Sequence, residues 1–426
     1  MKYNNVIDAL QSRGLIDALT NEELKKKVEK PIKVYIGFDP TADSLHLGNF
    51  VGIMMLAHFQ KFGHTPVIIL GGATGRIGDP SGKSKERPFL DEATLRKNIA
   101  SIRKNFEHVL DFEHPNARPI FLNNDEWLAP FHFIDFLRDV GKHFRINQMM
   151  AKEMVRTRLD SEEGMSFTEF SYQILQAYDF YHLFKERNVI LQMGGSDQWG
   201  NITAGIELIR KLAGETAYGL TFPLLTRSDG KKFGKTEEGA VWLSHDRLSP
   251  YEFYQYLFRI PDADVVRLMK MITFMDLDEI QEYEAQMGRS DYVPNTAQKK
   301  LAEEVTRIMH GKKGFELALR VTQAAAPGSK AKLDLETLQA ISKEMPHVSL
   351  DKKEIVGQKF VDVAVKINIL PSKGEATRLI QNGGAYLNDE KVEDAALRIQ
   401  EEHIIGGKYL LMGAGKKKKI LIKVLA

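Results

Sequence analysis

A strand, a helix and a second strand near the start of the chain most constrain its fold. Residues 33–38 alternate in a strand-like way, with Val34, Ile36 and Phe38 on one face. Residues 50–62 carry apolar side chains at helical spacing, and residues 65–70 form a continuous apolar run typical of a buried parallel strand. This order is a βαβ unit, whose right-handed crossover makes its two strands parallel. The sequence therefore predicts an α/β fold built on a parallel sheet.

The turn between the first strand and its helix is polar and contains Asp39, Thr41, His46 and Asn49. In open α/β sheets ligands bind at the carboxyl ends of strands, and a helix N-terminus attracts anions. The turn is therefore a candidate anion site, although an ordinary turn with an incidental histidine fits these residues equally well.

The second strand runs into a glycine-rich loop at 71–83 that fits no familiar phosphate motif. Its glycine spacings match neither a P-loop nor the G-x-G-x-x-G fingerprint. We still expect a loop of this kind to approach a ligand closely, and Asp79, Lys83 and Arg87 add one acidic and two basic side chains. Generic surface charge is the alternative.

A polar stripe interrupts an otherwise apolar helix predicted over 166–186. Tyr172, Gln176 and Asp179 are spaced i, i+4, i+7 and so share one helical face. A solvated outer face would account for them, but such a face more often carries Lys and Glu. Because buried polar groups need partners, we favour a stripe that faces a pocket.

The opening layout recurs in the middle of the chain. A buried strand at 189–193 leads into the turn Gly194–Asn201, and a helix follows over 202–212. Another apolar run at 220–225 precedes a basic loop at 226–236, which could close over an anionic substrate.

The last part of the chain differs in composition. Helices are predicted over 248–322, where Ser249 and Glu252 have capping-box spacing, and a linker over 323–354. Residues 355–426 contain 12 Lys or Arg against 8 Asp or Glu, including the run Lys416–Lys419, which the following strand would present. A small basic α+β module of this kind favours nucleic acid.

Composition excludes several classes of chemistry. The chain of 426 residues has no cysteine, which rules out disulfides, thiol catalysis and cysteine-ligated zinc. A hydrophobic content of 43%, a charged content of 27% and a net charge of +2 are ordinary for a globular protein. No signal-peptide pattern or membrane-spanning run is evident, so we expect a cytoplasmic protein without a membrane partner.

Three motifs in this order, His46–Asn49, Gly194–Asn201 and Lys232–Thr236, resemble those of bacterial tyrosyl-tRNA synthetases, which are class I aminoacyl-tRNA synthetases. The likeness covers essentially the whole chain. It implies a Rossmann-like α/β catalytic domain with a parallel sheet, then a helical domain, then a small C-terminal α+β RNA-binding module similar to ribosomal small-subunit protein four. The implied boundaries are catalytic domain 1–225, signature loop 226–247, helical anticodon-side domain 248–322, linker 323–354 and RNA-binding module 355–426.

The resemblance also implies an activity and partners. L-tyrosine and ATP, the latter accompanied by Mg²⁺, would form tyrosyl-adenylate and pyrophosphate, and the tyrosyl group would then pass to the terminal adenosine of tRNA(Tyr). Such catalysis rests on positioning and charge stabilisation, which agrees with a sequence that offers no cysteine nucleophile. We expect no tightly bound cofactor, no editing domain and a homodimer.

The resemblance also implies site residues in this chain, which are grouped here by the part of the substrates that each would contact. Those expected around the phenol are Tyr35, Asn124 and Asp179. Those expected at the ammonium are Asp79, Tyr172 and Gln176, with Gln198 at the carboxylate. Those expected at the ATP phosphates are Thr41, His46 and Asn49, and around pyrophosphate Lys83, Arg87, Lys232 and Lys235. Those expected at the ribose end of the adenylate are Asp39, Gly195 and Asp197.

Two positions depart from the class I signatures. Asn49 stands where a second histidine is usual, so it can donate a hydrogen bond but cannot carry charge. Phe233 and Gly234 replace the more usual Met and Ser of the second signature.

Three other readings compete with this one. A tryptophanyl-tRNA synthetase shares fold and chemistry, but its pocket would not be expected to pair Tyr35 with Asp179. A small nucleotidyltransferase would lack the basic loop, the helical domain and the RNA module. A non-catalytic RNA-binding protein on the same scaffold would be expected to have lost His46, Asp179 or the loop lysines.

Overall fold

The computed structural model describes residues 3–81, 90–228, 230, 233–236, 239–325, 333–342, 347–415 and 418–425, with only the backbone of 235–236, 324–325 and 340. It divides into two compact units. One comprises Met1–Leu248 with Tyr256–Met309, and the other comprises Ser249–Gln255 with His310–Ala426. Each unit is described by itself below. The domain boundaries expected from the sequence remain predictions.

The first unit is built on a six-stranded sheet of order β1-β6-β5-β2-β3-β4. Its strands are β1 (Ala18–Leu19), β2 (Lys33–Phe38), β3 (Thr65–Leu70), β4 (Ile120–Asn123), β5 (Val189–Gly195) and β6 (Tyr218–Phe222). All neighbours are parallel except the edge pair β1 and β6. The predicted parallel sheet is confirmed, with an antiparallel edge that the sequence did not reveal.

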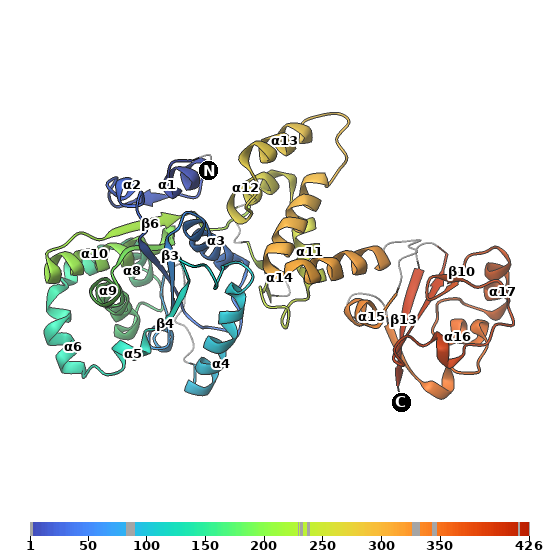
Figure 1. Cartoon of the computed structure of the whole chain (residues 1–426). Helices are drawn as coiled ribbons and strands as arrows, with labels where there is room; N and C mark the ends of the chain where they lie inside the picture. Colours follow the sequence, from blue (N-terminus) through green and yellow to red (C-terminus); the bar gives the residue numbers. More distant parts are fainter. Residues whose placement is uncertain are drawn as a thin grey trace. The chain divides into compact units, whose positions relative to one another are not determined.

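Strand β2 separates two packing faces, as its alternation predicts. Tyr35 packs in one cluster with Phe180 of α9 (Phe167–Arg187). On the other side, Gly52 of α3 (Leu47–Lys61) lies against Ile36 and Phe38. Figure 1 shows β3, which pairs with β2, between α3 and the pair α9 and α10 (Trp199–Ala213). Because β3 and β5 flank β2, the chain order reverses there, at the place where α/β sheets bind ligands.

Shorter elements complete the first unit. They are α1 (Val6–Ser12), α2 (Leu24–Lys27), α4 (Glu92–Ile102), α5 (Asp125–Leu128), α6 (Phe133–Asp139), α7 (Ile146–Met150) and α8 (Glu153–Leu159), the 3₁₀ turns at 74–76, 103–106, 141–143 and 196–198, and the small ribbon of β7 (Lys235–Thr236) and β8 (Gly239–Ala240).

Helices follow from residue 250, as the sequence predicts. They are α11 (Pro250–Phe258), α12 (Asp262–Ile272), α13 (Leu277–Met287) and α14 (Thr296–Ala325), which has a non-helical residue at Gly311. The capping box expected before α11 is present: Glu252 N donates to Ser249 Oγ at 3.1 Å, and Ser249 N donates to Glu252 Oε2 at 2.8 Å.

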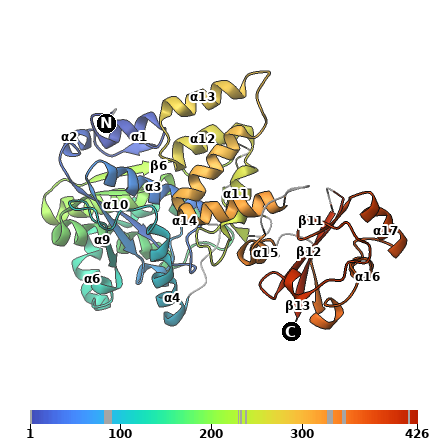
Figure 2. The same cartoon turned by 45° about the vertical axis from the view of Figure 1, so that its right-hand side comes forward.

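The second unit contains a five-stranded sheet of order β11-β10-β12-β13-β9 with its own apolar core. Its elements are α15 (Leu335–Ile341), β9 (His347–Asp351), a 3₁₀ turn at 352–354, α16 (Phe360–Lys366), α17 (Lys373–Gln381), β10 (Ala385–Leu387), β11 (Glu390–Lys391), a 3₁₀ turn at 401–403, β12 (Tyr409–Ala414) and β13 (Lys418–Leu425). Figure 2 shows α16 and α17 beside this sheet. The stretch 323–354, predicted to be a linker, contains α15 and β9, and β9 pairs with β13.

The lysine run 416–419 ends in the first two residues of β13, Lys418 and Lys419. Lys419 forms a buried ion pair with Asp389, with Nζ 2.8 Å from Oδ1. Lys418 Nζ donates to the carbonyl of Ile369 at 2.8 Å. Lys416 and Lys417 lie outside the described residues. Both described lysines are therefore tied to groups of their own module, Lys419 with a largely buried side chain and Lys418 as an exposed residue.

Across the part of the chain that the structure describes, no helix combines the length and the apolar character needed to cross a membrane.

Candidate active site

A cavity of about 350 Å³ lies in the first unit, at the carboxyl ends of β2 and β5. The predicted site residues whose side chains or backbone line it are Tyr35, Asp39, Thr41, His46, Asn49, Asp79, Asn124, Tyr172, Gln176, Asp179, Gly195, Asp197 and Gln198. Lys83, Arg87 and Lys232 lie outside the described residues, and only the backbone of Lys235, in β7, is described. The structure therefore brings together every predicted side chain that it describes.

A buried carboxylate with two donors forms one end of the cavity. Asp179 is 4% exposed. Its Oδ1 accepts a hydrogen bond from Trp127 Nε1 at 2.7 Å, and its Oδ2 accepts one from Asn124 Nδ2 at 2.9 Å. Tyr35 is 2% exposed and its ring packs on Phe180, with centroids 5.4 Å apart. The Tyr35 hydroxyl has no hydrogen-bond partner among the described residues. Because a buried hydroxyl without a partner is costly, this end fits a ligand that supplies one.

Burial also changes the proton affinity of these two groups. Desolvation raises the pKa of Asp179 from 3.8 to about 7, although the hydrogen bonds from Asn124 and Trp127 lower it. Desolvation, and then the nearby charge of Asp179, raise the pKa of Tyr35 well above its usual value. The end of the cavity therefore combines a neutral phenol with a carboxyl group that ionises near neutral pH.

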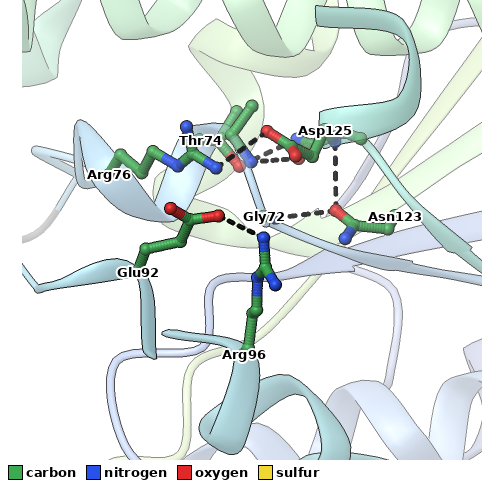
Figure 3. Close-up of polar contacts among 9 residues, drawn as sticks. Gly72, Thr74, Arg76, Glu92, Arg96, Asn123 and Asp125 are labelled. Carbon is green, nitrogen blue, oxygen red and sulfur yellow. Dashed lines mark hydrogen bonds and ion pairs between the residues drawn. The ribbon is translucent and has the colours of Figure 1, made fainter. Parts of the chain in front are cut away.

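Figure 3 shows how the loop after β3 is held by the segment after β4. Asn123 Oδ1 accepts hydrogen bonds from Gly72 N at 3.1 Å and Asp125 N at 3.0 Å, and Arg76 pairs with Asp125 at 3.2 Å. In the same way Asn124 Oδ1 accepts a bond from Ala73 N at 2.9 Å. Because this bond occupies the carbonyl side of Asn124, its amide nitrogen must face Asp179.

Gly71 of this loop lines the cavity, and the close packing of Gly71 and Gly72 involves side chains of the protein. A Cβ atom on Gly71 would lie 2.2 Å from Asp39 Oδ1, and one on Gly72 would lie 2.1 Å from Asn123 Oδ1. The two glycines thus allow protein side chains to approach the backbone closely. Thr74 then donates to Asp39 Oδ1 at 2.9 Å, while Tyr172 donates to Asp39 Oδ2 at 2.9 Å.

A second polar network lies along α9 and the turn before α10. Gln198 Nε2 donates to Asp79 Oδ2 at 2.6 Å, and Gln176 Nε2 donates to Gln198 Oε1 at 3.2 Å. Asn201 Nδ2 lies 3.1 Å from Gln176 Oε1 and 3.3 Å from Gln198 Oε1. The stripe predicted on this helix therefore faces the cavity and not solvent, and this prediction is confirmed.

The histidine turn forms the other end of the cavity. His46 is the N-cap of α3: its Nδ1 accepts a hydrogen bond from Gly48 N at 3.1 Å, and Asn49 Oδ1 accepts one from His46 N at 3.1 Å. This reciprocal capping fixes the entry to the helix, whose N-terminus favours negative charge. Asn49 thus has a local structural role in addition to lining the cavity, and its amide nitrogen can donate.

The described part of the basic loop packs on this turn. Phe233 is buried and lines the cavity, and its backbone N donates to Leu225 O at 3.0 Å. Gly234 has φ of +82°, and a Cβ atom there would lie 3.4 Å from Gly48 N. A side chain at this position would be strained by the positive φ, which explains the glycine in place of the usual serine. Among the described residues, no group of three His, Asp or Glu side chains could hold a metal ion.

Sequence reasoning missed several cavity residues. Thr74 lines the cavity and donates to Asp39, and Trp127 lies behind Asp179, to which it donates. Both orient other groups, and single-sequence patterns do not mark such residues. Gln192 also lines the cavity, is 2% exposed, and its Oε1 has no partner among the described residues. It could have been noticed, because it is an isolated polar residue in an apolar strand.

Comparison with known proteins agrees with this geometry. A family model described as tRNA synthetases class I (W and Y) matches residues 26–325, and one described as the tyrosine–tRNA ligase SYY-like C-terminal domain matches residues 336–422. The first covers tryptophan and tyrosine enzymes alike, so the choice between them rests on whole-chain relatives and on the second model.

Relatives that match nearly the whole chain are tyrosine–tRNA ligases. That of Protochlamydia amoebophila is 56% identical over 421 residues, which cover 99% of each chain. The chloroplastic and mitochondrial one of Arabidopsis thaliana is 51% identical, over 99% of this chain and 84% of that one. Among solved structures, a C-terminally truncated mitochondrial tyrosyl-tRNA synthetase of Aspergillus nidulans matches with a TM-score of 0.66 and 32% identity, covering 74% of this chain and 93% of that chain. The chain therefore belongs to the tyrosyl-tRNA synthetases, the class I enzymes that join tyrosine to its transfer RNA.

Proposed function

We propose that the cavity binds tyrosine with its phenol between Tyr35 and Asp179 and its reacting carboxylate toward the histidine turn. The observation that carries this orientation is the pairing of an unpartnered hydroxyl, on Tyr35, with a buried carboxylate. A phenol can accept a hydrogen bond from the first and donate one to the second. Phenylalanine would leave both groups unsatisfied, and buried polar groups without partners are costly.

The ammonium group of tyrosine would lie among Asp79, Tyr172 and Gln176. Tyr172 donates its proton to Asp39, and a hydroxyl oxygen is an acceptor to which an ammonium can donate. Asp79 supplies a negative charge on the same side of the cavity. Gln198, already bonded to Asp79, would approach the substrate carboxylate.

The reaction itself needs positioning more than a protein nucleophile. An oxygen of the tyrosine carboxylate attacks the α-phosphorus of ATP, the bond to the β-phosphate breaks, and pyrophosphate leaves. A ribose hydroxyl of the terminal tRNA adenosine then attacks the activated carbonyl, and AMP leaves. We assign Thr41, His46 and Asn49 to the phosphates, because they line the cavity at the N-terminus of α3, where negative charge is stabilised.

The remaining assignments follow from the resemblance and from the chemistry of the residues. Lys83, Arg87, Lys232 and Lys235 would neutralise the departing pyrophosphate. Asp39, Gly195 and Asp197 would hold the ribose end of the adenylate. Mg²⁺ would arrive with ATP as part of the substrate, since this ion is commonly held through substrate phosphates.

We further propose that the enzyme is a homodimer. Of the large apolar side chains that are exposed in the described residues, most fall between 133 and 199, including Phe133 at 64%, Ile134 at 69% and Phe167 at 68%. Exposed apolar groups that gather in one part of a surface mark interaction sites. A second copy of this chain would cover α6 and the start of α9.

The C-terminal module would contact tRNA. The enzyme would act in the cytoplasm, which cell fractionation can test.

Amino-acid-dependent exchange of pyrophosphate into ATP tests the proposed orientation. Tyrosine should support exchange, whereas phenylalanine, which lacks only the hydroxyl, should support very little at the same concentration. Equal exchange with phenylalanine would mean that Tyr35 and Asp179 do not read the phenol.

A further inference from the structure

Asn201, in the first turn of α10, is the least exposed polar side chain of the second network. It is 0% exposed. Its Nδ2 lies within hydrogen-bond distance of Gln176 Oε1, Gln198 Oε1 and, at 3.4 Å, Ser81 Oγ. Its own Oδ1 is buried and has no partner among the described residues. A buried amide that leaves its acceptor unsatisfied while directing its donors at two glutamines calls for an explanation.

The direction of each hydrogen bond in this network follows from Asp79. A carboxylate can only accept, so the Gln198 group that faces Asp79 Oδ2 must be its amide nitrogen. Gln198 Oε1 then points back and must receive a donor, which is Gln176 Nε2 at 3.2 Å. Gln176 Oε1 is consequently turned toward Asn201, which can satisfy it only with Nδ2.

We propose that Asn201 is a positioning residue for recognition of the substrate ammonium. By donating to both glutamine oxygens, it closes the chain of hydrogen bonds that ends on Asp79. The Gln176 carbonyl oxygen then keeps a second lone pair for a donor in the cavity. Asn201 does not touch the substrate in this account; it acts through Gln176 and Gln198. The inference rests on the proposed function, because it requires the ammonium to lie among Asp79, Tyr172 and Gln176.

Two substitutions separate this role from simple packing. Asn201→Ala removes the donor and leaves the glutamine oxygens short of a partner. Asn201→Asp keeps the shape but offers only acceptors, so Gln176 could face it only with Nε2, and the bond from Gln176 to Gln198 would be lost. Gln298→Ala is the matched control, because Gln298 is also a buried amide, 1% exposed, and donates to Ile260 O away from the cavity.

The experiment compares two ligands by calorimetric titration of the full chain. One is L-tyrosine and the other is 3-(4-hydroxyphenyl)propanoic acid, which lacks only the amino group. The dissociation constant of the propanoic acid divided by that of L-tyrosine measures recognition of the ammonium. We expect both Asn201 variants to reduce this ratio, Asn201→Asp by about tenfold, and Gln298→Ala to leave it unchanged. The KM for ATP should stay the same in all three variants.

The two possible failures are distinguishable. If the unchanged enzyme binds both ligands equally well, the ammonium site itself is wrongly assigned and the inference falls with it. If the unchanged enzyme prefers tyrosine and both Asn201 variants weaken the two ligands by the same factor, the ammonium site stands and Asn201 only packs. Should Asn201→Asp fail to fold, Asn201→Ala decides by the same ratio.

Discussion

Replacing Asp179 by asparagine should weaken tyrosine recognition and abolish its pH dependence. The side chain keeps its shape but loses its charge. A hydrogen bond to a charged group contributes about 1.5–3 kcal/mol, so kcat/KM for tyrosine in pyrophosphate exchange should fall by roughly 10- to 150-fold. Because the change replaces the charged acceptor proposed for the phenol by a neutral amide, kcat/KM for phenylalanine, which has no phenol hydroxyl, should fall much less.

The pH profile gives the sign of the effect. Burial raises the pKa of Asp179 to about 7 in the free enzyme, and kcat/KM reports ionisations of the free enzyme. For the unchanged protein kcat/KM for tyrosine should therefore rise with pH through about 7 and then level off. In Asp179→Asn this rise should be absent.

Asp179→Asn, which lowers kcat/KM for tyrosine, should raise the free energy of unfolding at alkaline pH. A carboxyl group whose pKa is raised on folding contributes stability that is present below its unfolded pKa and lost as pH rises through its folded pKa. For a rise in the pKa of Asp179 from 3.8 to about 7, the free energy of unfolding that is lost by pH 8 is roughly 4 kcal/mol. In Asp179→Asn the amide nitrogen meets the donor of Asn124 or Trp127, which costs about 2 kcal/mol.

The ligand-free Asp179→Asn variant should therefore be more stable than the unchanged protein by roughly 2 kcal/mol at pH 8. This advantage should disappear near pH 5, and the variant should be the less stable protein toward pH 4. Denaturant unfolding at the two pH values measures the difference. A variant with unchanged tyrosine kinetics and a retained pH dependence would refute the assignment of Asp179 as the ionised phenol acceptor.

Three further predictions concern the rest of the chain. Truncation before residue 333, which removes β9 together with its partner β13, should leave pyrophosphate exchange nearly intact and strongly reduce tRNA aminoacylation; equal loss of both would refute a separate role for the module. Ile134→Asp should shift the protein from dimer to monomer in sedimentation velocity, whereas Val293→Asp, at a similarly exposed 68%, should not; an unchanged Ile134→Asp dimer would place the interface elsewhere. Lys235→Ala should slow adenylate formation in stopped-flow measurements by at least about tenfold with little effect on tyrosine affinity, and a defect confined to tyrosine affinity would argue against a phosphate role.

Much of the fold could be predicted because local patterns coincide with tertiary packing. The continuous apolar run of β3 and the alternation of β2 both follow from a sheet covered on two faces. The antiparallel edge strand β1 has only two residues, too few for any periodicity. Lys419 looks like exposed charge in sequence, and only its tertiary contact with Asp389 reveals that its side chain is largely buried.

The candidate site was predictable where a residue broke the local pattern. Tyr172, Gln176 and Asp179 were conspicuous because polar groups on an apolar helix need partners. Trp127 and Asn201 were not, because their roles depend on which atoms they orient, and these contacts join segments distant in sequence. The orientation of Asn124, fixed by the backbone of Ala73, likewise requires coordinates.

The central claim is that the cavity recognises the phenol of tyrosine by hydrogen bonds to the hydroxyl of Tyr35 and the carboxylate of Asp179. A crystal structure of the enzyme with tyrosine tests it most directly. The account predicts the phenol oxygen within hydrogen-bond distance of both Tyr35 Oη and an oxygen of Asp179. A structure in which the phenol oxygen lies elsewhere, and the Tyr35 hydroxyl still lacks a partner, would contradict it.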